Sequence, residues 1–280
     1  MIHESINTLG GQHFRAMLLA VAFGLILVEY LFRRLDHDDS YDARETATSL
    51  VIALGNKLIG GMMTAVLALP LVFVYQHRLF DIPLDNVWWW LALFVAIEFS
   101  YYVHHVAMHK IRWFWATHSV HHSATKMNLS AAVRLGWGGN LTGGFLFYLP
   151  LIYLGFNPAA VLLVLGLGLF YQFFLHSAFV PNLGPLEWIF NTPRHHHVHH
   201  ASNSECLDRN FGSVLIVFDR MFGTFASAPQ GEALRFGLAG IRPTANPVSI
   251  LFGEWFRIAR DVVLAGNFRA RLRALFGPPV

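Results

Sequence analysis

The residues of this chain that could do chemistry are histidines set at helical spacing. The sequence holds 16 histidines, and 11 of them lie in three short clusters within residues 104–109, 118–122 and 195–200. Histidines three or four positions apart project from one face of an α-helix. Each cluster contains such a set. In chain order the sets are His105 and His109, then His118, His121 and His122, then His196, His199 and His200.

This pattern favours the binding of two metal ions. Eight imidazoles gathered in one space would be costly to bury as free groups, and in the protonated form they would repel one another. Neutral imidazole is a good ligand for iron, zinc and copper, so coordination removes both costs. Eight ligands exceed what one ion takes, and we therefore expect two ions. His104, His195 and His197 point elsewhere on the same helices, so we expect them to be neighbours of the ligands.

The composition predicts that these histidines belong to an integral membrane protein. Of the 280 residues, 55% are hydrophobic and 13% are charged, about half the charged share of a soluble domain. The single cysteine, Cys206, excludes a disulfide framework and a metal site built from several thiolates. The net charge of +3 comes without a basic stripe interleaved with stacking aromatics, so we expect no nucleic-acid partner.

The apolar stretches predict where the chain crosses the membrane. They cover residues 14–32, 50–79, 87–109, 140–155 and 159–178. The last two could be two spans or a shallower helical hairpin. Lysine and arginine gather in residues 33–49, in residues 110–134 and after residue 182, which places these segments on the cytoplasmic side. All the histidine clusters then lie on the same face of the membrane.

We therefore expect an all-α integral membrane protein with about four to five membrane helices and a cytoplasmic helical cap that holds a histidine-rich di-metal site. A single domain is expected over residues 1–280, with the spans and the first two histidine clusters in residues 1–179. The third cluster and an amphipathic C-terminus form the cap, residues 180–280. The stretch 250–275 mixes apolar residues with five arginines. It predicts either helices on an anionic membrane surface or an ordinary amphipathic helix packed on the domain.

Three segments resemble the fatty acid hydroxylase / sterol desaturase superfamily. The first runs from Glu98 to Ser123 and includes Trp115-Ala-Thr-His118-Ser-Val-His121-His122-Ser123. The others are residues 191–200 and residues 208–224. The likeness extends from about residue 40 to residue 275, and within the family the chain is most similar to the bacterial relatives of alkylglycerol monooxygenase. It implies membrane helices under a cytoplasmic cap, a non-haem di-iron centre and O2-dependent oxidation of a lipid C–H bond.

The resemblance assigns nine histidines as metal ligands. His176 matches an additional family histidine between the second and third clusters. The full set is His105, His109, His118, His121, His122, His176, His196, His199 and His200. The chain departs from the family at Glu98, where Asp is usual, and at Val106, where Arg is usual. Glu98 keeps a carboxylate that could orient a histidine, whereas Val106 removes a cation near the site.

Further polar residues of the resemblance have two possible roles each. Asp208, Asn210 and Asp219 could accept hydrogen bonds from the ligand N–H groups, or they could only cap helices of the cap domain. Asn128 and Arg134 fit the family segment after the second cluster. They could line the substrate entrance, or they could only position the loop.

The aromatic residues of the spans are expected to form an apolar channel from the bilayer, although lipid-facing or helix-packing positions remain open for each of them. These residues are Phe99, Tyr101, Tyr102, Phe170, Tyr171, Phe173 and Phe174.

The expected function is hydroxylation of a lipid C–H bond by two iron ions, with O2 as co-substrate. Electrons come from outside, through a reduced pterin or an electron-transfer protein. A lipid or sterol desaturase with the same di-iron centre is an alternative. A zinc-dependent membrane hydrolase would need an acidic base among the ligands, and a metal transporter would need ligands on both membrane faces. The expected location is a bacterial inner membrane with the site facing the cytoplasm; the oligomeric state stays open.

Overall fold

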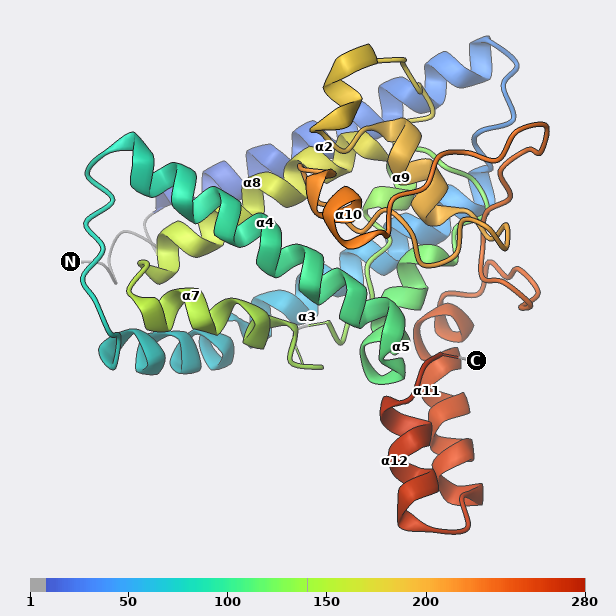
Figure 1. Cartoon of the computed structure of the whole chain (residues 1–280). Helices are drawn as coiled ribbons and strands as arrows, with labels where there is room; N and C mark the ends of the chain where they lie inside the picture. Colours follow the sequence, from blue (N-terminus) through green and yellow to red (C-terminus); the bar gives the residue numbers. More distant parts are fainter. Residues whose placement is uncertain (1–8, 140, 280) are drawn as a thin grey trace.

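The computed structural model describes residues 9–139 and 141–279, and its regular elements there are helices, apart from two isolated β-bridges. The all-helical architecture is therefore confirmed. Four long helices form a bundle (Figure 1): α2 (Leu9–Leu35), α3 (Ala43–Gln76), α4 (Val87–Lys110) and α8 (Pro158–Leu175). Most of the shorter elements lie at one end of this bundle.

The long helices begin at side chains that satisfy their free amides. Asn86 accepts hydrogen bonds from the Trp88 and Trp89 amides at the start of α4, and Asn157 accepts one from the Ala159 amide at the start of α8. Both are caps that Asn provides well. Pro158 occupies the first turn of α8, where its missing N–H is not needed.

Two helices among the described residues are long and apolar enough to cross a membrane, α4 and α8. The stretch expected at 140–155 behaves differently. Asn140 lies outside the described residues, and the rest forms a 3-10 helix of five residues, η1 (Gly144–Tyr148), and an α-helix of six, α7 (Leu149–Leu154). Together these extend about 20 Å, against about 30 Å of hydrocarbon. The segment is too short for a full helical span, as in the hairpin alternative.

The core of the bundle lies at the end away from the histidine clusters. Leu93 and Ile97 of α4 pack with Ile152 of α7 and Val161 of α8, and all four are almost fully buried. At this end α7 stops at a residue with a φ of 126°, Gly155, where a Cβ would collide with the chain that follows α3. The turn before α8 therefore sits beside the loop before α4. The opposite ends of α4 and α8 carry the histidines, so the clusters share one end, as the charge pattern predicts.

The remaining elements complete the histidine end. Between α4 and α7 lie α5 (Arg112–His122) and α6 (Leu129–Ala132). After α8 come η2 (Gly184–Trp188), α9 (Pro193–His200), α10 (Val217–Phe222), α11 (Pro247–Leu264) and α12 (Phe268–Phe276). In Figure 1, α9 and α10 lie at the right-hand end of the bundle, while α11 and α12 project sideways as a hairpin.

Candidate metal centre

Nine histidines meet at this end in two adjacent groups. The five-histidine group consists of His105, His109, His118, His122 and His199. The four-histidine group consists of His121, His176, His196 and His200. Within each group the ligand nitrogens lie within 4.8 Å of one another. The groups touch, because the rings of His122 and His200 stack with their centroids 4.3 Å apart. The structure thus brings together all nine residues that the resemblance assigns as ligands.

Helical periodicity explains how α5 and α9 serve both groups. In α5 the pair four apart, His118 and His122, belongs to the five-histidine group, while His121 turns to the other. In α9 the pair four apart belongs to the four-histidine group, and His199 turns back to the first. Residues at i and i+4 share a face, while an intervening residue points to one side. Each helix therefore links the two groups.

Backbone carbonyls orient three of these rings. The Nδ1 atom of His105 donates to the carbonyl of Phe211, and that of His199 donates to the carbonyl of Arg209; both N–O distances are 2.8 Å. His176 Nδ1 donates to its own helix, at the Gln172 carbonyl, also over 2.8 Å. A carbonyl oxygen can only accept, so the proton is on Nδ1 and the Nε2 atom carries a free lone pair. These lone pairs are the ones that could bind a metal.

The inward nitrogens are packed as ligands of a common ion would be. His176 Nε2 lies 3.0 Å from His121 Nε2 and 3.1 Å from His196 Nε2. In the other group, the buried Nε2 atoms of His109 and His199 have no hydrogen-bond partner among the described residues. With metal–nitrogen distances of about 2.1 Å, neighbouring ligands at right angles would be about 3 Å apart. The donor set therefore fits a metal ion in each group.

The rings outside the membrane helices are held neutral, which is the form that binds metals. Burial, together with the neighbouring histidines, lowers the pKa of His122 and of His200 well below its ordinary value. Burial lowers the pKa of His121 to about 4. Metal ions bind neutral imidazole. These rings are already neutral at pH 7, so no proton has to leave them when a metal binds.

Among the four acidic and amide residues expected to support the site, Asp208 contacts a histidine directly. Its Oδ1 lies 3.3 Å from His109 Nδ1, and its Oδ2 accepts a 2.5 Å hydrogen bond from Lys110. Burial by itself would raise the pKa of Asp208, but the hydrogen bonds from His109 and Lys110 bring it down to about 2. The residue stays ionised, in a left-handed backbone conformation with a φ of 58°, and fixes the orientation of the His109 ring.

Asp219 acts on the histidines through the backbone. It is fully buried, and its carboxylate accepts hydrogen bonds from the Phe211 and Gly212 amides over 2.8 and 2.7 Å. This carboxylate holds the same loop whose Phe211 carbonyl orients His105. Asp219 therefore positions the acceptor of a histidine instead of contacting the ring.

Glu98 and Asn210 hold the two ends of this loop. Glu98 accepts hydrogen bonds of 2.8 Å from the Val214 and Leu215 amides. Asn210 donates to the carbonyl of His195, at the start of the third cluster. Neither side chain bonds a histidine ring, so both contribute to the shape of the loop.

A carboxylate that the sequence reasoning missed anchors the segment after His176. One oxygen of Glu29, in α2, accepts hydrogen bonds from the Ser177 hydroxyl and the Ala178 amide, over 2.7 and 2.9 Å. The other accepts a 2.8 Å bond from the amide that begins α6. Glu29 is the only charged residue within the apolar run 16–32, and this is the signal that could have found it.

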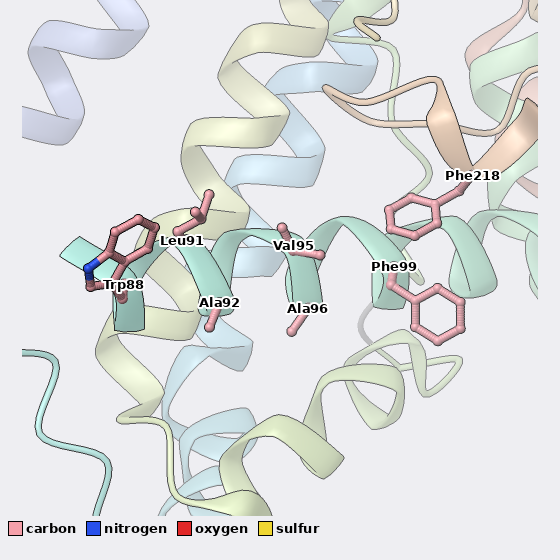
Figure 2. Close-up of a pocket in the computed structure, with 7 residues that line it drawn as sticks. All are labelled: Trp88, Leu91, Ala92, Val95, Ala96, Phe99 and Phe218. Atoms are coloured by element: carbon pink, nitrogen blue, oxygen red, sulfur yellow. The ribbon is translucent and has the colours of Figure 1, made fainter. Parts of the chain in front are cut away.

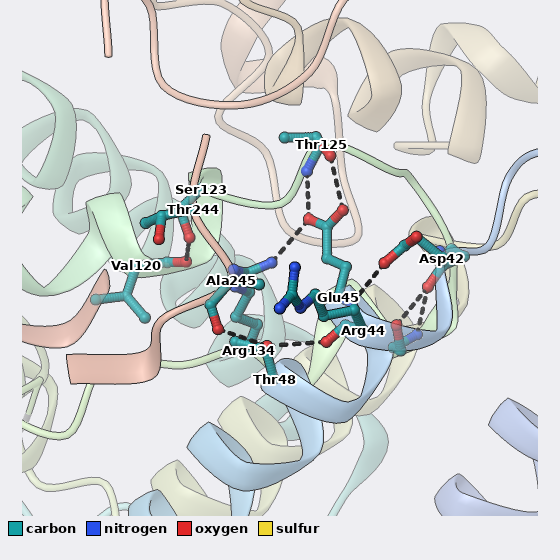
Figure 3. A network of polar contacts seen from close by, with 12 residues as sticks. Asp42, Arg44, Glu45, Thr48, Val120, Ser123, Thr125, Arg134, Thr244 and Ala245 are labelled. Atoms are coloured by element: carbon teal, nitrogen blue, oxygen red, sulfur yellow. Dashed lines mark hydrogen bonds and ion pairs between the residues drawn. The ribbon is translucent and has the colours of Figure 1, made fainter. Parts of the chain in front are cut away.

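Arg134 and Asn128 position the chain that follows the second histidine cluster. Arg134 is fully buried and donates to Glu45 over 2.9 Å, and the same carboxylate accepts two hydrogen bonds from Thr125, as Figure 3 shows. Asn128 accepts from the Ser130 amide at the start of α6. Neither residue lines the cavity beside the histidines, so these contacts favour the loop-positioning role.

A cavity of about 430 Å³ adjoins the histidines. His118, His121 and His176 form part of its wall, and the cavity continues to apolar side chains of the bundle core such as Ile152 and Leu165. The polar part of its wall includes His104 and Tyr101, whose hydroxyl donates a 2.7 Å hydrogen bond to Gln172. Apolar side chains form most of the remaining wall. Such a cavity suits an alkyl chain.

The expected aromatic channel is only partly formed by the residues named for it. Tyr101 and Phe173 line the cavity. Phe99 instead lines an apolar groove of about 570 Å³ on the outer face of α4, between Trp88 and Phe218, as Figure 2 shows. No titratable group lies in the wall of this groove, so it offers no side chain for the chemistry. The hydroxyl of Tyr171 donates to a backbone carbonyl, and Phe170 and Phe174 are exposed on α8.

Several known proteins are similar to this chain. Residues 90–224 match the family model described as fatty acid hydroxylase. Alkylglycerol monooxygenase of Homo sapiens is 36% identical over 209 residues, 74% of this chain and 46% of the relative. The Danio rerio protein of the same name is 38% identical over 218 residues, 77% of this chain and 48% of the relative. Ornithine lipid hydroxylase OlsE of Rhizobium tropici is 31% identical over 151 residues, 54% and 45% of the two chains.

The chain spans about half the length of the alkylglycerol monooxygenases that it matches. No solved structure shows a significant match to it.

Proposed function

Because this chain belongs to the fatty acid hydroxylase superfamily, we propose that it is a membrane-bound di-iron monooxygenase that hydroxylates a lipid C–H bond with O2. The observation that carries the proposal is the pair of histidine groups beside an apolar cavity. The names of its relatives, a monooxygenase of alkylglycerols and a hydroxylase of ornithine lipids, support a lipid with a long alkyl or acyl chain as substrate.

In this proposal the five-histidine group holds one iron and the four-histidine group holds the other. The bound iron supplies the activation of O2 that an unreactive C–H bond requires. All-imidazole donor sets suit iron, and neither group includes a carboxylate. A hydrolytic zinc site of the His-Glu-x-x-His kind has a glutamate base between its two histidine ligands. None of the three histidine clusters contains an acidic residue, so their sequences favour the oxygenase.

The chain's own contribution is to place the substrate and to keep water out. The apolar end of the cavity, with Ile152 and Leu165, would take the substrate chain, and its histidine end would hold the carbon that reacts. Fixing the reacting carbon beside the centre replaces a chance encounter with a bound geometry. The carbonyls of Phe211, Arg209 and Gln172 keep the Nδ1 protons away from the centre.

Electrons must come from a partner, for which we propose a reduced pterin or an electron-transfer protein. The proposed location is an inner membrane with the histidine end in the cytoplasm, which follows from the arginine distribution in the sequence.

The test is to purify the full chain into lipid nanodiscs, measure its metals, and follow lipid products by mass spectrometry under ¹⁸O2. We expect two irons per chain and one labelled oxygen in a lipid product. A product that has lost two hydrogens would assign the protein as a desaturase. A single zinc with anaerobic ester cleavage would overturn the oxygenase.

A further inference from the structure

The hairpin of α11 and α12 leaves a row of apolar side chains exposed by about 40% to 80%. On α11 they recur at helical spacing as Val248, Phe252, Phe256 and Val263, which are 58%, 38%, 66% and 78% exposed. On α12 they are Phe268, Leu272 and Phe276, which are four residues apart and 74%, 40% and 52% exposed. We call these seven residues the hairpin stripe. Large apolar side chains aligned in this way mark an interaction surface.

The opposite face of the hairpin is already packed. Ile250 and Leu251 of α11 are buried against Ile52 of α3 and Val120 of α5. Arg112 of α5 fixes the orientation through a buried 2.7 Å ion pair with Glu254. Packing on the domain therefore accounts for one face of α11 and leaves the hairpin stripe unexplained.

Arginines flank the stripe. Arg260, Arg269, Arg271 and Arg273 are exposed. Within residues 9–139 and 141–279, no carboxylate forms an ion pair with any of the three on α12. The nearest acid of α11, Asp261, already pairs with Arg112 and Arg260. Apolar rows bordered by uncompensated cations are complementary to a surface with anionic headgroups above acyl chains.

The position of the hairpin agrees with this partner. It leaves the bundle at the histidine end and projects roughly across the direction of the long helices, as Figure 1 shows. If α4 and α8 cross the bilayer, the hairpin lies along the membrane interface. Its stripe also begins beside the cavity, since Phe252 packs against Trp137, and Trp137 lines the cavity and donates to the Ile52 carbonyl.

We infer that the α11–α12 hairpin docks on the anionic cytoplasmic surface of the protein's own membrane, with the stripe among the acyl chains and the arginines at lipid phosphates. Docking would fix α5, and with it three of the histidines, relative to the bilayer from which the lipid enters. This inference rests on the proposed membrane location, and it does not depend on the metal or the reaction.

The single buried cysteine makes a labelling test practical. In a Cys206→Ser background, Val263→Cys places an environment-sensitive nitrobenzoxadiazole label in the stripe. Gln230→Cys labels an exposed loop of the cap as the control. The full chain is placed in nanodiscs of phosphatidylcholine, with or without phosphatidylglycerol, and in detergent. Iodide quenches the label from water, and brominated lipids quench it from the acyl region.

We expect the Val263 label in anionic nanodiscs to be protected from iodide and quenched by brominated lipid, while the Gln230 label stays accessible to iodide. Replacing Arg269, Arg271 and Arg273 by Gln should weaken docking on anionic lipid by on the order of 100-fold, since each arginine near such a surface contributes about 1 kcal/mol. A Val263 label equally open to iodide in every membrane would overturn the inference. So would protection in detergent that depends on protein concentration, which would assign the stripe to a second copy. Neither result bears on lipid oxidation.

Discussion

The five-histidine and four-histidine groups share α5 and α9 but have different surroundings. The five-histidine group reaches the surface, where His109 meets a carboxylate that is 38% exposed, Asp208, and Lys110 beside it is 54% exposed. The four-histidine group is buried throughout, and its His121 and His176 line the cavity. Of the other group, His118 lines it.

Two short helices, α5 and α9, therefore build two groups whose surroundings differ. The five-histidine group is contacted by the charged side chain of Asp208 and has one histidine more than the other group. The four-histidine group contributes two histidines to the wall of the cavity in which a substrate chain could fit. We expect the two groups to respond differently to substitution, and the following predictions test that asymmetry.

The largest effect should come from His121→Ala. A site with four ligands cannot lose one without binding its metal more weakly, so the iron content should fall from two towards one per chain. Product formation should fall by more than the roughly 100-fold that is typical when a residue hydrogen-bonded to a metal ligand is replaced. His109→Ala leaves four histidines in its group and should keep more of its metal. Metal analysis of the two purified variants checks this. Equal loss of iron would break the comparison, and a His121→Ala protein that still oxidises lipid would contradict the site.

Filling the cavity should have the next largest effect. Leu165→Phe places extra volume in the cavity wall, and a mismatch of one methylene in such a pocket costs about 10-fold to 200-fold in kcat/KM. Long-chain substrates should suffer more than short ones. The matched control is Leu91→Phe in the outer groove of α4, which should leave kcat/KM unchanged. An equal loss of kcat/KM in both variants would show that the cavity does not bind the substrate.

Glu29→Gln should weaken iron binding at the four-histidine group specifically. The amide nitrogen of the new Gln cannot accept hydrogen bonds, so the half-buried donors after His176 lose a partner at a cost of about 1 kcal/mol. We expect a lower melting temperature and about 10-fold weaker iron binding. In a His121→Ala background the substitution should remove no further iron, because the affected site is already empty. The exposed Glu205→Gln serves as the control.

Asp208→Asn should have the smallest effect, because this carboxylate is partly exposed and contacts one of five ligands. The change keeps the shape but removes the charge that supports His109, and we expect about 10-fold weaker iron binding at the five-histidine group alone. Iron titration in the Asp208→Asn and His121→Ala double variant isolates this group. Asp39→Asn, at an exposed position, is the control. An equal change in iron binding from this control would show that Asp208 does not support the metal site.

Much of the site could be predicted because its pattern is local. Spacing of three and four residues places His118, His121 and His122 on nearly one face whatever the rest of the chain does. His176 has no such pattern around it, and the family resemblance alone pointed to it. Glu29 was missed because the partners that connect it to the site, the Leu129 amide and the Ser177 hydroxyl, lie 100 and 148 residues away in the sequence.

The polar residues and aromatics were harder to assign. Asp208, Asn210 and Asp219 lie within twelve residues of one another and have side chains of similar shape, but Asp208 alone of them contacts a histidine ring. Tyr101 and Tyr102 are adjacent, and the first lines the cavity while the second packs on Phe211. Which side of a helix faces a cavity is decided by its neighbours, and these are brought together only on folding.

By itself the sequence determined a helical membrane protein with histidines on one end of the bundle, because hydrophobic length, charge distribution and helical periodicity are properties of short segments. The tertiary structure decided that the histidines divide into groups of five and four, which of them meet the cavity, and that α11 turns an apolar face outwards. These features depend on how α4, α5, α8 and α9 pack together. Their contacts join residues far apart in the chain, and no local pattern specifies them.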